Sequence, residues 1–133
     1  MERRSFRCAI PSNRSSRGNK KVTINGKTFD SMKEARRYSD LRLLEIAGEI
    51  RDLKCQVEFL LIPAQYEPDT VDAKGRVHKG KCIERACKYI ADFTYYTKDG
   101  QYVVEDAKGF REEHYRLKRK MMLYLLKIRI KET

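Results

Sequence analysis

The sequence predicts a mixed α/β domain with a central sheet flanked by helices, in the element order ββαβββαβ. Three observations support this fold class: a hairpin signal at Asn25-Gly26, two segments with helical periodicity, and two strand-like segments joined at Lys98-Asp99-Gly100. The 133 residues suffice for one ordinary hydrophobic core. We therefore expect a single folded domain over residues 21–133.

The charge of the chain indicates a polyanionic partner. The formal net charge is +11, and the first 21 residues contribute seven Lys or Arg residues against one Glu. Residues 1–20 have no apolar periodicity, so we expect a flexible basic arm there. The most direct partner for such a chain is nucleic acid, although charge alone does not distinguish DNA from RNA.

The composition argues against a membrane or secreted protein. No apolar run approaches the ~20 residues of a membrane span, and no secretory apolar region follows the N-terminus. The four cysteines are scattered, and the one close pair, Cys82 and Cys87, has a spacing that matches a zinc site poorly. We expect reduced thiols in a cytoplasmic protein.

Turn and cap signals set the expected boundaries of the elements. The expected elements are a hairpin over 21–29, a helix from 31 to about 47, a strand over 49–62, strands over 83–96 and 101–108, a helix over 112–126 and an edge strand over 127–131. Ser31 and Glu34 have the spacing of a capping box, and Gly48 ends the first helix. Residues 64–81 are expected to form a long polar loop, either functional or mobile.

The register of the second hairpin decides which charged side chains meet. If Lys98-Asp99-Gly100 forms a three-residue loop, Asp92 lies opposite Asp106. A two-residue turn would instead place Asp92 between Glu105 and Ala107, and we favour the three-residue loop. Opposed side chains have Cβ atoms about 5 Å apart, so two carboxylates would share one small space.

Charged side chains at this end of the hairpin suggest a metal site. Lys108 lies two residues beyond Asp106 and therefore points to the same face. Opposed like charges are destabilising unless something compensates them, and a divalent cation is the usual compensator for clustered carboxylates. The alternative is a structural ion-pair cluster of Asp92, Asp106 and Lys108. Glu105 is expected on the other face of its strand, as a solvated or paired charge.

These motifs resemble a known superfamily. Asp92, the Asp106-Ala107-Lys108 tripeptide and a preceding helix with Glu34 resemble the PD-(D/E)xK nucleases, which share the restriction-endonuclease-like fold. Residues 29–38, 48–59, 89–93 and 104–109 more closely resemble a family of small phage- and prophage-encoded proteins of unassigned function. The resemblance extends from about Lys21 to Ile130.

The resemblance implies a set of metal ligands. Asp92 and Asp106 would bind the metal through their carboxylates, and Ala107 through its backbone carbonyl. Glu34 would be a further ligand, directly or through water, unless it serves only as the third residue of the capping box. Mg²⁺ or Mn²⁺ would be the cofactor, because hard oxygen ligands and substrate phosphate suit such ions.

The resemblance also implies two supporting residues near the metal. Lys108 would orient or activate the attacking water, which adds positive charge where the transition state gains negative charge. Gln56 would be an accessory polar residue of the same catalytic site. The alternative for Gln56 is that its side chain satisfies a buried backbone group.

The second helix supplies candidate DNA contacts. Its basic side chains are Arg111, Arg116, Lys118, Arg119 and Lys120. A run of charges can be a solvated face, but beside the expected site we favour contacts with phosphate. We expect His114 at the surface or on a phosphate, and Met121 and Met122 in the core.

The resemblance implies a metal-dependent DNA endonuclease that hydrolyses phosphodiester bonds. Small basic phage nucleases of this fold often act on branched DNA and frequently form dimers, so we expect a structure-selective, resolvase-like activity and a homodimer by analogy. The resemblance also implies a phage or prophage protein that acts in the cytoplasm of its host. The competing function is a non-catalytic nucleic-acid-binding protein that retains the fold.

Overall fold

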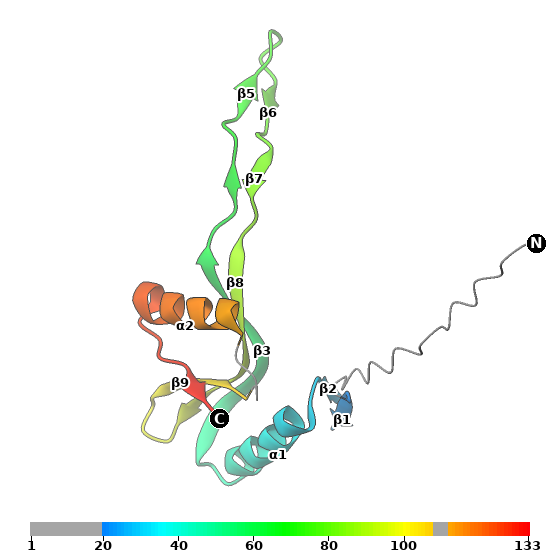
Figure 1. The fold of residues 1–133 in the computed structure, drawn as a ribbon, viewed down its shortest axis with the longest axis vertical. Helices are drawn as coiled ribbons and strands as arrows, with labels where there is room; N and C mark the ends of the chain where they lie inside the picture. The colour runs from blue at the N-terminus through cyan, green and yellow to red at the C-terminus, as the bar shows by residue number, and fades with distance from the viewer. Residues whose placement is uncertain (1–19, 108–111) are drawn as a thin grey trace, which may run out of the picture.

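The computed structural model describes residues 20–107 and 112–133. Figure 1 shows a body of sheet and helices from which a long, narrow ribbon extends. This ribbon, residues 63–86, is called the arm below and is distinct from the basic segment expected over residues 1–20, which lies outside the described residues apart from Lys20. The elements in chain order are β1 (Val22–Ile24), β2 (Lys27–Phe29), α1 (Met32–Ile46), β3 (Ile50–Ile62), β4 (Gln65–Tyr66), β5 (Thr70–Val71), β6 (Val77–His78), β7 (Cys82–Glu84), β8 (Cys87–Thr97), β9 (Tyr102–Asp106), α2 (Glu113–Leu126) and β10 (Lys131–Glu132).

The main sheet has the strand order β10-β9-β8-β3. The β3–β8 and β8–β9 pairs are antiparallel, whereas β10 runs parallel to β9. The helices α1 and α2 both contact β3, and α2 also contacts β8. The described residues therefore form a mixed α/β structure with a mostly antiparallel sheet, which confirms the expected fold class at that level.

The hairpin of β8 and β9 has the three-residue loop that the sequence favours. Tyr96 pairs with Tyr102 and Phe93 with Glu105, and the same register places Asp92 opposite Asp106. Gly100 has a φ of +85°, in the left-handed region where glycine meets no Cβ clash. The loop type thus brings the two aspartates to the same place along the paired strands.

Each helix covers its own hydrophobic cluster. Under α1, the rings of Phe29, Tyr38 and Phe93 pack with centroids 4.9–6.4 Å apart. Under α2, Tyr115 and Met122 are buried against β8 and β9. These two clusters fix the helices against the strands that carry the aspartates.

Three expectations about the chain between and after these elements were wrong. Residues 64–81 are not an irregular loop, because β4 pairs with β7 and β5 with β6 to form the arm. The strand expected over 83–96 is divided into β7 and β8. The edge strand expected over 127–131 is reduced to β10, since Lys127 adopts a left-handed conformation (φ 58°) at the end of α2.

A buried ion pair connects α1 to β9. Arg37 donates from Nε to Oε1 of Glu105 at 2.8 Å and from Nη2 to Oε2 at 3.1 Å, and the Glu105 side chain is 0% exposed. Burial and the neighbouring Glu105 carboxylate raise the pKa of Tyr95. Glu105 is therefore a paired charge, one of the two possibilities that the sequence left open. The pair attaches α1 to β9 at Arg37, which lies about one helical turn after Glu34.

We predict that Arg37→Met lowers the free energy of unfolding by about 3 kcal/mol, because it leaves the Glu105 carboxylate buried without its partner. Arg42→Met is the control: Arg42 pairs with Glu45 on the same helix but is largely exposed, so its loss should cost less than about 1 kcal/mol. Urea unfolding at neutral pH measures both. Equal losses in the two variants would contradict the structural role of the buried pair.

Candidate functional site

Three elements bring Glu34, Gln56 and Asp92 together. Glu34 lies in the first turn of α1, Gln56 in β3 and Asp92 in β8. The Gln56 amide donates from Nε2 to Oε1 of Glu34 at 2.8 Å and lies 3.5 Å from Oδ1 of Asp92. One amide thus bridges two carboxylates that are only 6% and 4% exposed. The structure thus brings together three of the residues that the resemblance assigned to the site.

Gln56 occupies a rare backbone conformation. Its φ is +53°, in the left-handed region, although it lies within a strand between the Cys55–Phe93 and Val57–Ala91 pairs. Such a conformation costs a residue other than glycine about 1–3 kcal/mol and persists only where the surroundings enforce it. From this backbone conformation the Gln56 amide reaches both carboxylates. The local sequence contains no signal for this feature.

Asp92 and Asp106 are both buried and both hydrogen-bonded. Oδ2 of Asp92 accepts the backbone N–H of Ala107 at 2.8 Å, so the backbone at Ala107 lies beside this carboxylate. Oδ2 of Asp106 accepts the hydroxyl of Tyr89 at 2.8 Å. Tyr89 is a member of the site that the sequence analysis missed, and its distance from the motif along the chain gave no signal.

The carboxylate cluster perturbs the titration of Glu34. Burial, together with the negative charges of Asp92 and Asp30, raises the pKa of Glu34 to about 7. Hydrogen bonds from Gln56 and from the backbone of Asp30 act in the opposite direction. At neutral pH the group is therefore divided between its charged and neutral forms. A cation at the cluster would favour the charged form.

The cap at the start of α1 uses different atoms of Glu34. Its backbone N–H donates to Oγ of Ser31 at 3.1 Å, which confirms Ser31 as the N-cap. The Glu34 carboxylate accepts hydrogen bonds from Gln56 and from the backbone of Asp30, the residue before the N-cap. The side chain therefore contacts both the candidate site and the chain at the start of α1.

The donor set is suitable for a hard divalent cation, although its arrangement is not that of a closed metal site. Glu34, Asp92 and Asp106 offer carboxylate oxygens in a buried setting, which are the ligands that Mg²⁺ and Mn²⁺ prefer. Within residues 20–107 and 112–133, no three His, Cys, Asp or Glu side chains are grouped closely enough to hold an ion. Lys108, the remaining catalytic candidate, lies outside the described residues.

The basic side chains of α2 differ in their surroundings. Arg116 and Lys120 are exposed and Lys118 is half-buried. Arg119 donates from Nη1 to Oε1 of Glu132 at 2.7 Å, and this carboxylate raises the pKa of Arg119. Arg119 is therefore held by β10, and the other three are more accessible to phosphate. Arg111 lies outside the described residues.

A surface pocket of about 500 Å³ lies between the second half of α2 and the C-terminal segment. Its lining residues are Arg119, Lys120, Leu123, Arg129, Ile130 and Glu132. Arg129 adds a cation that the sequence analysis did not select. His114 forms an exposed ion pair with Glu112, which agrees with the surface position expected for it.

A family model described as "Protein of unknown function (DUF1064)" matches residues 14–131, which is most of the chain. The chain belongs to this family. No curated protein and no solved structure matches it significantly. In the part of the chain that the structure describes, no helix is long and apolar enough to cross a membrane.

We predict that Glu34 makes the metal-free protein less stable as the pH rises. Because its folded pKa of about 7 exceeds the usual 4.5, its contribution is fully present below about pH 4.5 and is lost as the pH passes 7. Glu34→Gln removes this loss. Above pH 7, the free energy of unfolding of the variant should therefore exceed that of the unsubstituted protein by about 2 kcal/mol. Urea unfolding in EDTA across this range measures the difference.

The exposed Glu49→Gln is the control for that series, because its side chain lies in a turn away from the cluster. This variant measures how the loss of one exposed carboxylate affects the free energy of unfolding. A Glu34→Gln difference in unfolding free energy that does not change with pH would show that burial and Asp92 do not act on Glu34 as described.

Proposed function

We propose that the chain hydrolyses phosphodiester bonds in DNA, with Mg²⁺ or Mn²⁺ held by Glu34, Asp92 and Asp106. The observation that carries this proposal is the bridge of Gln56 between two buried carboxylates from separate elements. Burying several carboxylates in one place is costly, and strain at Gln56 adds to that cost. A catalytic metal site accounts for both features, because it needs clustered negative charge in a fixed geometry.

Each site residue has a role that follows from its contacts. Asp92 and Asp106 would be the principal ligands, and Glu34 a third, direct or through water. Gln56 holds Glu34 and Asp92 in place, and rotation of its amide would present an oxygen in place of N–H. The metal would lower the pKa of a bound water and offset charge on the scissile phosphate.

Two further groups complete the proposed chemistry. Lys108 follows Asp106 by two residues, and by resemblance it would orient or activate the attacking water. The Ala107 carbonyl would be a backbone ligand, and its N–H already fixes the adjacent chain to Asp92. Tyr89 donates its hydroxyl to Oδ2 of Asp106 and so holds this carboxylate in a fixed orientation.

The charge of the chain supports DNA as the substrate. The net charge of +11 favours a polyanion, and Arg116, Lys118 and Lys120 follow the site along α2. By analogy with small basic nucleases of the restriction-endonuclease-like fold, branched DNA is the first substrate to test and a homodimer the first assembly. The same analogy places the protein in the cytoplasm of a phage host.

One observation favours the non-catalytic alternative. The amide N–H of Gln56, and not an oxygen, lies between Glu34 and Asp92. A hydrogen-bond donor in that position compensates the carboxylates without a metal. The chain would then bind nucleic acid with a closed polar cluster that serves only the fold, and cleavage assays separate the two functions.

We predict that the parent nicks supercoiled plasmid in Mg²⁺ or Mn²⁺ and not in EDTA. Asp92→Asn and Asp106→Asn should each reduce cleavage by about 100-fold or more, because each removes a ligand charge while keeping a hydrogen-bond acceptor. Asp99→Asn, in the exposed turn between β8 and β9, is the control and should cleave as the parent does. Full activity of either site variant would reject the assignment.

We predict that the basic face of α2 contributes to the salt dependence of DNA binding. Replacing Lys118 and Lys120 together by Gln should make the fall of log K with log[salt] less steep by about 2. Each phosphate that a lysine no longer neutralises reduces the steepness by roughly 0.9. Lys98→Gln, in the turn between β8 and β9, tests the effect of removing a cation elsewhere. Fluorescence anisotropy over a salt series gives the slopes. An unchanged slope in the double variant would show that these lysines face solvent and do not contact phosphate.

A further inference from the structure

The arm, residues 63–86, is an ordered ribbon that has no core of its own. Gln65 pairs with Glu84 and Val71 with Val77 along its length. Every residue of the arm, all of which the structure describes, is exposed or half-buried. Isolated two-stranded ribbons are marginally stable in water. Specific polar contacts must therefore define its shape.

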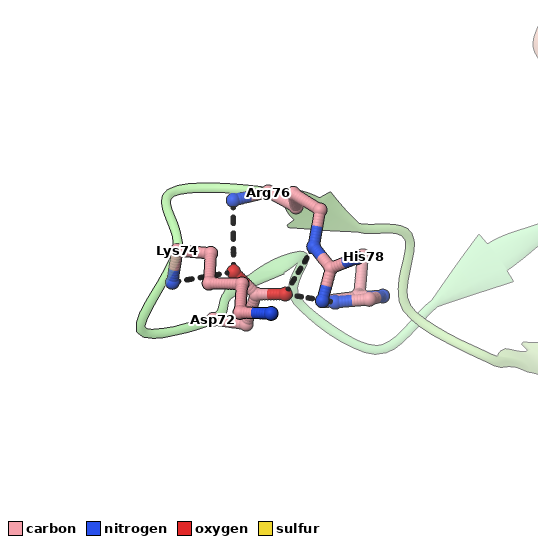
Figure 2. A network of polar contacts seen from close by, with 4 residues as sticks. All are labelled: Asp72, Lys74, Arg76 and His78. Atoms are coloured by element: carbon pink, nitrogen blue, oxygen red, sulfur yellow. Dashed lines mark hydrogen bonds and ion pairs between the residues drawn. The ribbon is translucent and has the colours of Figure 1, made fainter.

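The tip of the arm is organised by Asp72. Oδ1 of Asp72 accepts the backbone N–H groups of Lys74 and Arg76, each at 2.9 Å. Oδ2 lies 2.8 Å from Nε of Arg76 and 3.1 Å from Nε2 of His78 (Figure 2). The hydrogen bond from the Arg76 backbone is the largest of the causes that lower the pKa of Asp72. One side chain thus sets the turn and positions the Arg76 guanidinium and the His78 ring beside it.

The middle of the arm is specified by a close approach of its two strands. A Cβ added at Gly80 would lie 1.7 Å from the carbonyl oxygen of Glu67, so only glycine fits there. The backbone N–H of Gly80 donates to Oδ1 of Asp69 at 2.9 Å, and Glu67 N–H donates to the carbonyl of Lys81 at 2.8 Å. These contacts hold the two strands of the arm in one fixed arrangement, which no hydrophobic core requires.

The two strands of the arm, taken together with the ends of β3 and β8 at its base, carry opposite charge. The outgoing strand, residues 58–73, contains no Lys or Arg and has four acids: Glu58, Glu67, Asp69 and Asp72. The return strand, residues 74–88, has one acid, Glu84, and six cations: Lys74, Arg76, Lys79, Lys81, Arg85 and Lys88. Among the described residues, four of these cations have no acidic partner, namely Lys74, Lys79, Lys81 and Arg85. The return strand therefore presents uncompensated positive charge.

The return strand leads directly into the candidate site. It continues as β8, in which Asp92 follows Lys88 by four residues. At about 3.3 Å per residue, the segment from Lys74 to Asp92 can span up to about 60 Å, the length of roughly 17 base pairs. A duplex with a phosphate at Asp92 and its axis along the arm would meet these cations in succession.

We propose that the return strand of the arm, residues 74–88, binds the phosphate backbone of duplex DNA that flanks the cleavage site. The inference rests on the proposed function, because the site of cleavage defines where the flanking duplex begins. Charge selects DNA over a second copy of the chain: two arms that met through equivalent edges would oppose acid to acid or base to base. Fixed tip geometry reduces the ordering cost of binding.

The test compares duplexes of about 12 and about 40 base pairs, shorter and longer than the span of the arm. The arm variant replaces Lys74, Lys79, Lys81 and Arg85 by Gln, and its control replaces the three lysines by Arg and keeps the charge. Both are made with Asp106→Asn so that binding is measured without cleavage. The arm variant should lose at least tenfold in affinity for the long duplex and little for the short one, whereas the control should retain affinity.

A second measurement uses the unaltered arm. Hydroxyl-radical footprinting of the Asp106→Asn protein should show protection that extends roughly 17 base pairs to one side of the bound site. Equal affinity losses on both duplexes, or no extended protection, would overturn the inference. An arm variant that turns a dimer into a monomer in sedimentation without loss of DNA affinity would assign the arm to a second copy instead. If the unsubstituted protein never cleaves DNA but its DNA affinity still depends on the arm, only the proposed nuclease activity is rejected.

Discussion

The register of the β8–β9 hairpin is the constraint on which the rest of the structure depends. The loop at Lys98-Asp99-Gly100 places Asp92 opposite Asp106, and it directs Glu105 toward Arg37 of α1. Because side chains alternate along a strand, a shift of β9 by one residue would exchange the faces of its side chains. Asp106 would then lie on the face that Glu105 now occupies, and Glu105 would lose its guanidinium partner. The same turn therefore decides both how α1 is attached and where the carboxylates converge.

Compensation of buried charge explains how the chain tolerates this arrangement. Glu34 accepts a hydrogen bond from Gln56, Asp92 from the backbone of Ala107, and Asp106 from Tyr89. Burial nevertheless raises the pKa of Glu34 to about 7, so the compensation is incomplete where Glu34 faces Asp92. An unfavourable concentration of negative charge remains, which is the property that a divalent cation would relieve. Stability and proposed activity thus make opposing demands on the same carboxylates.

Local signals in the sequence were sufficient for some elements and insufficient for others. The hairpin register follows from one glycine turn, and the start of α1 from Ser31, because both depend on neighbours in the chain. The arm was missed because its strands are only two or three residues long, too short for a periodicity that would distinguish them from a loop. Its contacts join residues such as Asp69 and Gly80, which are distant in sequence. The left-handed Gln56 was equally hidden, since the groups that its amide contacts come from α1 and β8.

The central proposal is that Glu34, Asp92 and Asp106 hold one cation, although the described residues contain no group of three such side chains already close enough to bind an ion. Titration of Mn²⁺ into the metal-free protein, followed by calorimetry, tests it most directly. Our account predicts saturable binding to the parent at neutral pH and at least tenfold weaker binding to Asp92→Asn, with both proteins folded. Mn²⁺ that binds Asp92→Asn as tightly as the parent, or binds neither, would contradict the claim that these carboxylates serve a metal.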